Sequence, residues 1–382
     1  MFFNIDCHVS VIEDVSLALA RHGYDVDSHL LSGHHWTLGK PRASMGTGPG
    51  VEGKVGYGSI NLTSWERLIG ERNDSGAIVA AGQRFHDENP RLDNYTGFIA
   101  TYPPAFALLY EKFLRPILVV MPIRYDHMVT GSPEIWRKMN DFLCRGIQSG
   151  RITVIGNNQF DAKYFEYFTG QPVSWISSTC DYIDSRAPHY DSAAVHEDYF
   201  LAFGEHPGCR AAQAAVPGVH FFVDHFNRAY RHEEIPKAKG VVWIPYNASI
   251  MSFFEHYRLC IPLFCPTREF LVALWEKELA MTQHNWHPSP VGGSNLPRAG
   301  TDMPDPTTAE GFRAWLQYSD FYNEEELPHV VRFSSWADLR EKLVTADLAN
   351  ISAKMVVANA VREARNQAKW KLVVAKIEAY QL

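Results

Sequence analysis

The chain has 382 residues, which suggests two or three domains at about 150 residues each. Hydrophobic residues make up 46% and charged residues 21%, so the chain can bury a large core and is neither disordered nor a small disulfide-stapled scaffold. The net charge of −7 argues against a nucleic-acid binder that neutralises phosphates over a broad face, although one small phosphorylated ligand is compatible with it.

The sequence predicts a cytoplasmic protein without a transmembrane segment. Its longest apolar runs, such as residues 115–122, fall well short of the roughly 20 residues of a membrane-spanning helix. Residues 1–6 carry no basic region and include Asp6, so a signal peptide is not expected. The six cysteines are scattered without a C-x-x-C pair, which favours reduced thiols over a disulfide framework or a zinc site.

The opening residues alternate between strand and helix patterns. Residues 2–5 predict a strand, residues 11–21 an amphipathic helix and residues 24–31 a second strand. Ser10 stands at the N-cap position of a capping-box pattern, and Gly23 suits the end of the helix. A strand–helix–strand opening favours a parallel sheet with its ligand at the carboxyl ends of the strands.

Alternation continues through both halves of the chain, interrupted by a glycine-rich span at 33–60 and a proline-rich span at 285–310 that predict loops. In a first domain over residues 1–185, strands are expected at 76–80, 97–101, 116–123, 152–155 and 173–176, and helices at 104–113, 134–149 and 160–168. After a polar linker at 184–198, a second domain over 186–345 has expected strands at 199–203, 219–223, 240–245 and 261–265 and a helix at 250–257. Residues 346–382 predict C-terminal helices that pack back toward the first domain. The fold class is therefore α/β, with two Rossmann-like domains facing across a cleft.

The clearest local pattern lies in the second domain. A strand ending at Pro245 leads into a small polar turn and a helix that carries Glu255, and Pro262 opens the next strand. A polar turn at a helix N-terminus offers backbone N–H groups to phosphate, and a nearby carboxylate can accept hydrogen bonds from sugar hydroxyls. This arrangement resembles the donor-binding half of GT-B-fold glycosyltransferases, in which an acidic residue stands seven positions before such a proline, as Glu255 does before Pro262.

The resemblance implies a glycosyltransferase, of the hexosyl- or pentosyltransferase kind, that uses a nucleotide-sugar. Its donor would bind the second domain, through Tyr246, Asn247, Ser249, Ser252 and Glu255, and the C-terminal helix would cross back to the first domain. The retaining members of this group carry a Glu eight residues before the acidic residue, where this chain has Asn247. That departure favours an inverting reaction.

Inverting transfer requires a base that takes the proton of the acceptor hydroxyl. His8 follows the first strand directly, at the sheet edge where ligands bind, and Asp126 is the rival candidate at the end of the strand 116–123. The acceptor, a glycan or another hydroxyl compound, is expected to contact Ser10, Trp36 and His127, with the Trp36 ring as a stacking platform for a sugar.

Neither a metal nor another cofactor is expected in this reaction. No apolar strand runs into a D-x-D pair, and the adjacent histidines His34 and His35 do not form a metal-binding pattern. Two alternatives to a transferase remain open: a nucleotide-sugar 2-epimerase of the same fold, and a sugar- or nucleotide-binding protein without turnover.

Overall fold

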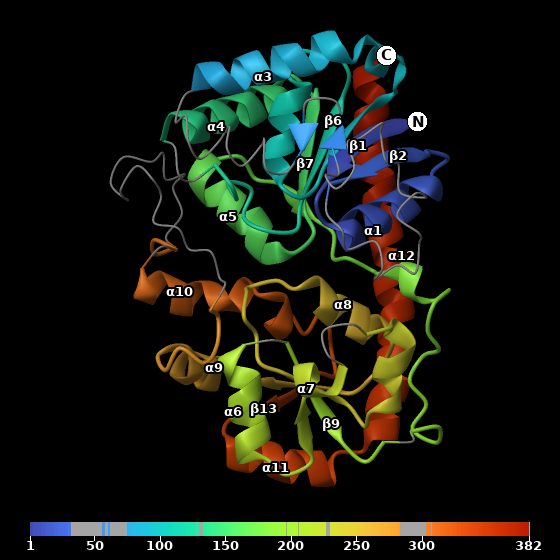
Figure 1. The fold of residues 1–382 in the computed structure, drawn as a ribbon, viewed down its shortest axis with the longest axis vertical. Coiled ribbons are helices and arrows are strands. Elements are labelled where there is room, and N and C mark those ends of the chain that lie inside the picture. The colour runs from blue at the N-terminus through green and yellow to red at the C-terminus, as the bar shows by residue number, and fades with distance from the viewer. Residues whose placement is uncertain are drawn as a thin grey trace. The chain divides into compact units, whose positions relative to one another are not determined.

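The computed structural model describes residues 1–31, 56–57, 60–61, 75–129, 133–195, 197–204, 206–226, 230–282, 303–306 and 308–381. The chain divides into two compact units (Figure 1). Unit 1 comprises the described parts of Met1–Ser177, Trp286–Thr308 and Asn366–Leu382, and unit 2 those of Ser178–Asn285 and Ala309–Arg365. Each unit is an α/β structure built on a parallel sheet, as the alternation of strands and helices predicts.

The sheet of unit 1 has the strand order β2-β1-β5-β6-β7-β8, and every neighbouring pair is parallel. Its strands are β1 (Phe2–Asp6), β2 (Val26–Leu30), β5 (Gly97–Ala100), β6 (Ile117–Met121), β7 (Ile152–Gly156) and β8 (Ser174–Trp175). β1, β5 and β6 are buried along their whole length. This explains the continuous apolar sequences of β5 and β6, whereas β1 also buries the polar residues Asn4 and Asp6. A separate antiparallel pair joins β3 (Gly56–Tyr57) to β4 (Ile60–Asn61).

The helices of unit 1 connect these strands. They are α1 (Val9–Ala20), α3 (Ser75–Glu88), α4 (Pro133–Gln148) and α5 (Gln159–Thr169), with 3₁₀ segments η3 (Pro90–Asn94) and η4 (Pro104–Tyr110). α1 leads from β1 to β2 in one direction along the sheet, whereas α4 and α5 lead from β6 to β8 in the other. The right-handed crossovers usual in parallel sheets would therefore put α1 on one face and α4 and α5 on the other. Where the sequence predicts a helix over residues 104–113, the structure has the shorter 3₁₀ segment η4.

Two local predictions in unit 1 are wrong. The expected strand at 76–80 belongs to α3, in which Ile78, Ala81 and Phe85 are buried at helical spacing. The run of small and apolar residues around Ile78 is too short to distinguish the two periods. Ser10 is not the N-cap of α1, because the helix begins at Val9 and His8 occupies that position without a side-chain capping bond. Gly23 does end the helix, with a φ of 83° and the N–H of Tyr24 on the carbonyl of Leu19.

The sheet of unit 2 has the strand order β10-β9-β11-β12-β13 and is also parallel throughout. Its strands are β9 (Phe200–Phe203), β10 (Val219–Phe221), β11 (Val241–Trp243), β12 (Leu263–Pro266) and β13 (Val331–Phe333). Its helices are α6 (Pro207–Ala215), α7 (Phe222–Phe226), α8 (Met251–Arg258), α9 (Arg268–Trp275), α10 (Ala309–Trp315) and α11 (Trp336–Thr345), with 3₁₀ segments η5 (Asp181–Ile183), η6 (His232–Lys237), η7 (Leu316–Tyr318) and η8 (Asp320–Tyr322). β13 has no counterpart among the predicted strands. It is a three-residue strand with Arg332 at its centre and only Phe333 fully buried.

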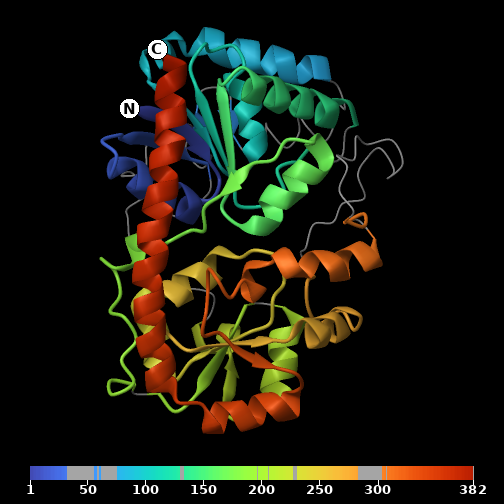
Figure 2. The same cartoon turned by 180° about the vertical axis from the view of Figure 1, so that it is seen from behind.

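The chain passes from unit 1 to unit 2 at Ser177–Ser178, before the polar residues 184–198 that suggest a linker. It returns through α12 (Leu348–Gln381), a single helix of 34 residues (Figure 2). Residues of α12 up to Arg365 belong to unit 2, and those from Asn366 belong to unit 1. Among the described residues, no helix has the length and apolar character needed to cross a membrane.

Candidate functional site

Each sheet reverses the direction of its strand order once, and ligands of open parallel sheets bind beside such a reversal. In unit 1 the chain goes from β1 outward to β2 and then returns to the other side of β1 with β5. In unit 2 it goes from β9 to β10 and then to β11 on the other side of β9. We refer to the loops that follow β1 and β5 as the unit 1 edge and those that follow β9 and β11 as the unit 2 edge.

The carboxyl group of Asp6 joins the two loops of the unit 1 edge. Its Oδ1 accepts the backbone N–H of His8 at 2.6 Å, and its Oδ2 accepts the N–H of Tyr102 at 3.1 Å and the hydroxyl of Thr101. The N–H of Cys7 donates to the carbonyl of Tyr102 at 2.8 Å and completes the connection. Burial raises the pKa of Asp6 to about 7, and these hydrogen bonds oppose the rise only in part.

A row of three aromatic side chains begins at the unit 1 edge with His8 and Tyr102 and ends with His127, in the loop after β6. The ring of Tyr102 lies 5.6 Å from that of His8 and 5.3 Å from that of His127, between centroids. The Tyr102 hydroxyl and Nε2 of His127 share a hydrogen bond of 3.2 Å. All three side chains are half-buried, so this row combines a fixed geometry with access to solvent. Ser10 lies next to it in the first turn of α1 and is buried.

Asp126 occupies a different environment from that of His8. Its side chain is 3% exposed, and its Oδ2 accepts hydrogen bonds from Nε1 of Trp136 at 3.0 Å and from the hydroxyl of Tyr164 at 3.3 Å. Burial raises the pKa of Asp126 to about 6 against the effect of those bonds. Nearby, the buried pair of Arg124 and Asp161, with 3.2 Å between Nε and Oδ1, holds the loop after β6 to α5. Asp126 therefore lies inside the packing of α4 and α5.

At the unit 2 edge, two backbone carbonyl groups of the turn between β11 and α8 accept hydrogen bonds from other segments of unit 2. The N–H of Met281 donates to the carbonyl of Pro245 at 2.8 Å, and the hydroxyl of Ser319 donates to the carbonyl of Ala248 at 2.6 Å. Asn247 and Ser249 are buried in this turn, and the Asn247 side-chain oxygen accepts the N–H of Ala248 at 2.8 Å.

Tyr246 and Ser252 flank this turn and are half-buried. The Ser252 hydroxyl shares a hydrogen bond with Tyr230, whose pKa is raised well above its usual range by burial. The Tyr246 ring lies 5.3 Å from that of His206, which precedes α6 in the loop after β9.

His206 is a buried residue of the unit 2 edge that the sequence patterns do not identify. Burial lowers its pKa to about 4, so it is neutral near pH 7. Gly204 has a φ of 126°, and a Cβ at this position would come within 2.5 Å of Nε2 of His206, so the close approach requires glycine. The loop after β9 is thus shaped around the His206 ring.

Glu255 lies on α8, and its carboxylate is engaged within unit 2. Its Oε1 accepts the hydroxyl of Tyr182 at 2.5 Å, and its Oε2 lies 3.4 Å from Nε2 of His232. Burial opposes ionisation of Glu255, but the charge of His232 and the hydrogen bonds of both neighbours outweigh it and lower the pKa to about 2. These contacts tie α8 to η5 and η6.

The structure thus places His8 and Ser10 at the unit 1 edge, with His127 reaching Tyr102 from the loop after β6. It places Tyr246, Asn247, Ser249 and Ser252 at the unit 2 edge. Trp36 lies outside the described residues. Asp6, Thr101 and Tyr102 are central to the unit 1 edge, although the sequence patterns do not identify them as site residues. Their signal is that they directly end or follow buried strands.

Among the residues that the structure describes, no three His, Cys, Asp or Glu side chains gather in a group that could hold a metal ion. No family model matches the chain, and no curated protein is significantly similar to it.

Proposed function

We propose that the protein is a glycosyltransferase that moves a sugar from a nucleotide-sugar donor to a hydroxyl group of an acceptor. The observation that carries the proposal is the row of His8, Tyr102 and His127 at the reversal of the first sheet. It places titratable groups where parallel sheets bind ligands. The second sheet and the division of α12 between the units add support, because they fit the resemblance of Glu255 and Pro262 to GT-B enzymes.

In this proposal His8 is the general base. As the acceptor oxygen attacks the anomeric carbon, its proton passes to the imidazole of His8 and the bond to the nucleoside diphosphate breaks. His8 is favoured over Asp126 because it is half-buried at the sheet edge, whereas the Asp126 carboxyl is occupied by Trp136 and Tyr164. His127 and Ser10 contribute to the acceptor side.

The donor binds the unit 2 edge. Tyr246, Asn247, Ser249 and Ser252 surround the start of α8, where backbone N–H groups and the positive end of the helix dipole favour phosphate oxygens. Glu255 acts through the position of α8, since its carboxylate is held by Tyr182 and His232. Asn247, in place of the Glu of retaining enzymes, supports inversion at the anomeric carbon.

A panel of sugar nucleotides tests the proposal when nucleoside diphosphate release is measured with and without a mixture of glycan acceptors. Release that requires an acceptor is the expected result. A donor sugar that changes at C2 without transfer would show an epimerase, and thermal stabilisation without release would show a binding protein. Either outcome would overturn the proposed transfer.

A further inference from the structure

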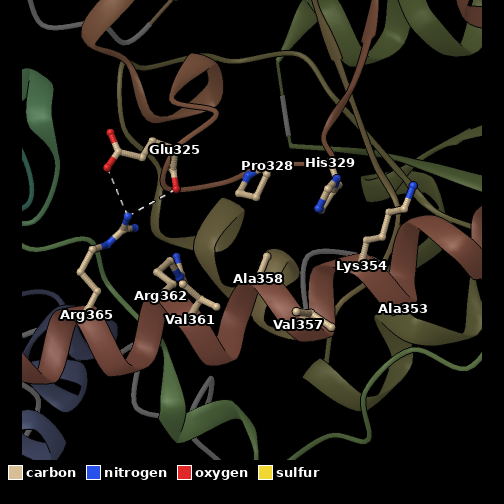
Figure 3. A pocket seen from close by; sticks show the side chains of 10 residues that line it. All are labelled: Glu325, Pro328, His329, Ala353, Lys354, Val357, Ala358, Val361, Arg362 and Arg365. Carbon is tan, nitrogen blue, oxygen red and sulfur yellow. Dashed lines mark hydrogen bonds and ion pairs between the residues drawn. The ribbon is translucent and has the colours of Figure 1, made fainter.

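A pocket of about 550 Å³ lies within unit 2, between α12 and the segment that precedes β13 (Figure 3). Pro328 and His329 form one wall, and side chains of α12, among them Val357, Val361 and Arg362, form the other. The volume falls within the range of roughly 300–1,000 Å³ that small-molecule sites occupy.

The pocket is separate from the unit 2 edge. His329 lies two residues before Val331, where β13 begins, and the sheet is parallel, so this wall stands at the amino ends of the strands. Asn247 and Ser249 follow the carboxyl end of β11 at the opposite side of the sheet. A hydrogen bond of 3.0 Å from the Tyr257 hydroxyl to the carbonyl of Pro328 fixes the wall to the end of α8. A ligand of this pocket would therefore not occupy the proposed donor site.

Arg362 is the unusual residue of the pocket. Its side chain is 1% exposed, its Nη2 donates weakly to the carbonyl of Thr179 at 3.4 Å, and its guanidinium lies 5.3 Å from the Tyr257 ring. Nε and Nη1 have no hydrogen-bond partner among the described residues. A buried cation with open donors is costly unless an anion compensates it.

The acidic residues of the adjoining segment do not supply that anion. Glu325 forms an ion pair with Arg365 at 3.6 Å between the charged atoms (Figure 3). Glu326 forms a second ion pair with the same Arg365, at 2.5 Å. Lys354 and His329 add further basic groups at the exposed rim of the pocket. The pocket therefore has an excess of basic side chains, although the chain as a whole carries a net charge of −7.

The remaining lining is apolar. Val357 and Val361 lie one helical turn apart on α12 and are 66% and 62% exposed. Together with Pro328 they provide an apolar surface beside the basic groups. Such a combination suits an amphiphilic ligand better than an inorganic ion.

We propose that this pocket binds a small organic anion, with its phosphate or carboxylate group against Arg362 and Lys354 and its apolar part against Val357, Val361 and Pro328. The site goes beyond the transfer reaction and does not depend on it. A ligand bound there would leave the proposed donor loop free, because the pocket lies at the opposite edge of the sheet.

Binding of hexyl phosphate, hexanoate, inorganic phosphate and hexanol to the full chain tests this proposal by calorimetry and thermal shift. At least one of the two alkyl anions is expected to bind, more tightly than inorganic phosphate, and hexanol is not. The preference between hexyl phosphate and hexanoate identifies the headgroup. Because no sugar nucleotide is present, failure here leaves the transferase proposal unaffected.

Two variants sharpen the test. Arg362→Met keeps the length of an unbranched side chain and removes the cation, so affinity for the alkyl anion should fall about 10- to 100-fold, as expected for a lost charged hydrogen bond. Lys354→Glu changes an exposed residue that the fold does not need, and should also weaken binding. Lys371→Gln, on the exposed face of α12 outside the pocket, is the control and should have no effect.

Several outcomes would overturn the proposal. Hexanol that binds as well as the alkyl anions would show an apolar pocket without charge recognition. No binding of either alkyl anion at millimolar concentration, or unchanged affinity in Lys354→Glu, would remove the anion site. If Arg362→Met does not fold, the affinity of Lys354→Glu for the alkyl anions and the binding of hexanol to the wild type still show whether the pocket recognises an anion.

Discussion

The two sheets share one pattern of strand order but surround their buried carboxyl groups differently. Asp6 in unit 1 is contacted by neutral donors, namely the Thr101 hydroxyl and the N–H groups of His8 and Tyr102, and burial raises its pKa to about 7. Glu255 in unit 2 is equally buried, yet the neighbouring His232 helps to hold its pKa at about 2. Burial therefore does not decide the charge of a carboxyl group on its own, because the partner can reverse its effect.

This difference separates the chemistry of the two edges. The unit 1 edge holds one carboxyl group with a pKa near neutral pH, that of Asp6, beside the half-buried His8. The unit 2 edge presents neutral groups, since Asn247 and Ser249 do not titrate and burial lowers the pKa of His206 to about 4. The proposed reaction accordingly assigns proton transfer to unit 1 and donor binding to unit 2.

The largest expected effect is on proton transfer at the unit 1 edge. His8→Ala should lower turnover by about 10²–10⁴-fold with little change in donor affinity, because a general base acts on the chemical step. Steady-state kinetics with calorimetric donor titration measure both quantities. His22→Gln, just beyond the other end of α1, is the matched control.

If Asp126→Asn reduces turnover while His8→Ala stays near the wild type, then Asp126 and not His8 is the general base. Unchanged turnover in both variants would contradict a base at either position. Proton transfer could then not be assigned to the unit 1 edge, although the difference between the pKa values of Asp6 and Glu255 would remain.

The next effect is on stability through Glu255. Glu255→Gln removes a charge that Tyr182 and His232 contact, and should lower the free energy of unfolding by about 1.5–3 kcal/mol. Glu276→Gln breaks an exposed pair with Arg313 and should cost no more than about 1 kcal/mol. Urea unfolding measures both, and equal losses would show that burial does not strengthen the Glu255 contacts.

The pH dependence of stability should have opposite signs for the two carboxyl groups. Asp6 keeps its proton in the folded state up to about pH 7 but loses it near pH 4 when unfolded, so its contribution to stability falls as the pH rises from 4 to 7. Glu255 contributes stability above about pH 4.5 and loses it as the pH falls toward 2.

Asp6→Asn isolates the first of these effects, since asparagine resembles the neutral carboxyl group. The difference in unfolding free energy between wild type and Asp6→Asn should change with a slope of at most about 1.4 kcal/mol per pH unit between pH 4 and 7, to the disadvantage of the wild type at higher pH. Urea unfolding across this range checks the sign. A difference independent of pH would mean that Asp6 is ionised throughout.

The smallest expected effect concerns the Tyr102–His127 contact. Tyr102→Phe removes the hydroxyl that shares a hydrogen bond of 3.2 Å with Nε2 of His127. A double-mutant cycle with His127→Gln should give a coupling of about 0.5–1.5 kcal/mol, as for an ordinary hydrogen bond. A coupling of zero would indicate that the two side chains are independent in solution.

Much of the architecture follows from local patterns in the sequence. The buried strand β6 lies within the apolar run 116–123, and the polar turn before α8 is visible in residues 246–249. The position of His8 after β1 also follows from the short strand before it. These features depend on backbone geometry and on the spacing of neighbouring residues, which a single segment contains.

The partners of the site residues could not be predicted in the same way. Thr101 is 95 positions from Asp6, and Tyr182 is 73 positions from Glu255. Helical spacing assigns Glu255 to a helix but does not tell which segment packs against its face. The role of Trp36 stays a prediction, as it lies outside the described residues.

The alternation of strands and helices, and the polar residues at the ends of strands, were therefore accessible from the order of amino acids alone. The charge states of Asp6 and Glu255 were set by contacts between distant segments. The physical reason is that steric preferences and hydrophobic period act over a few residues, whereas a pKa depends on the burial and the charged neighbours that folding brings together.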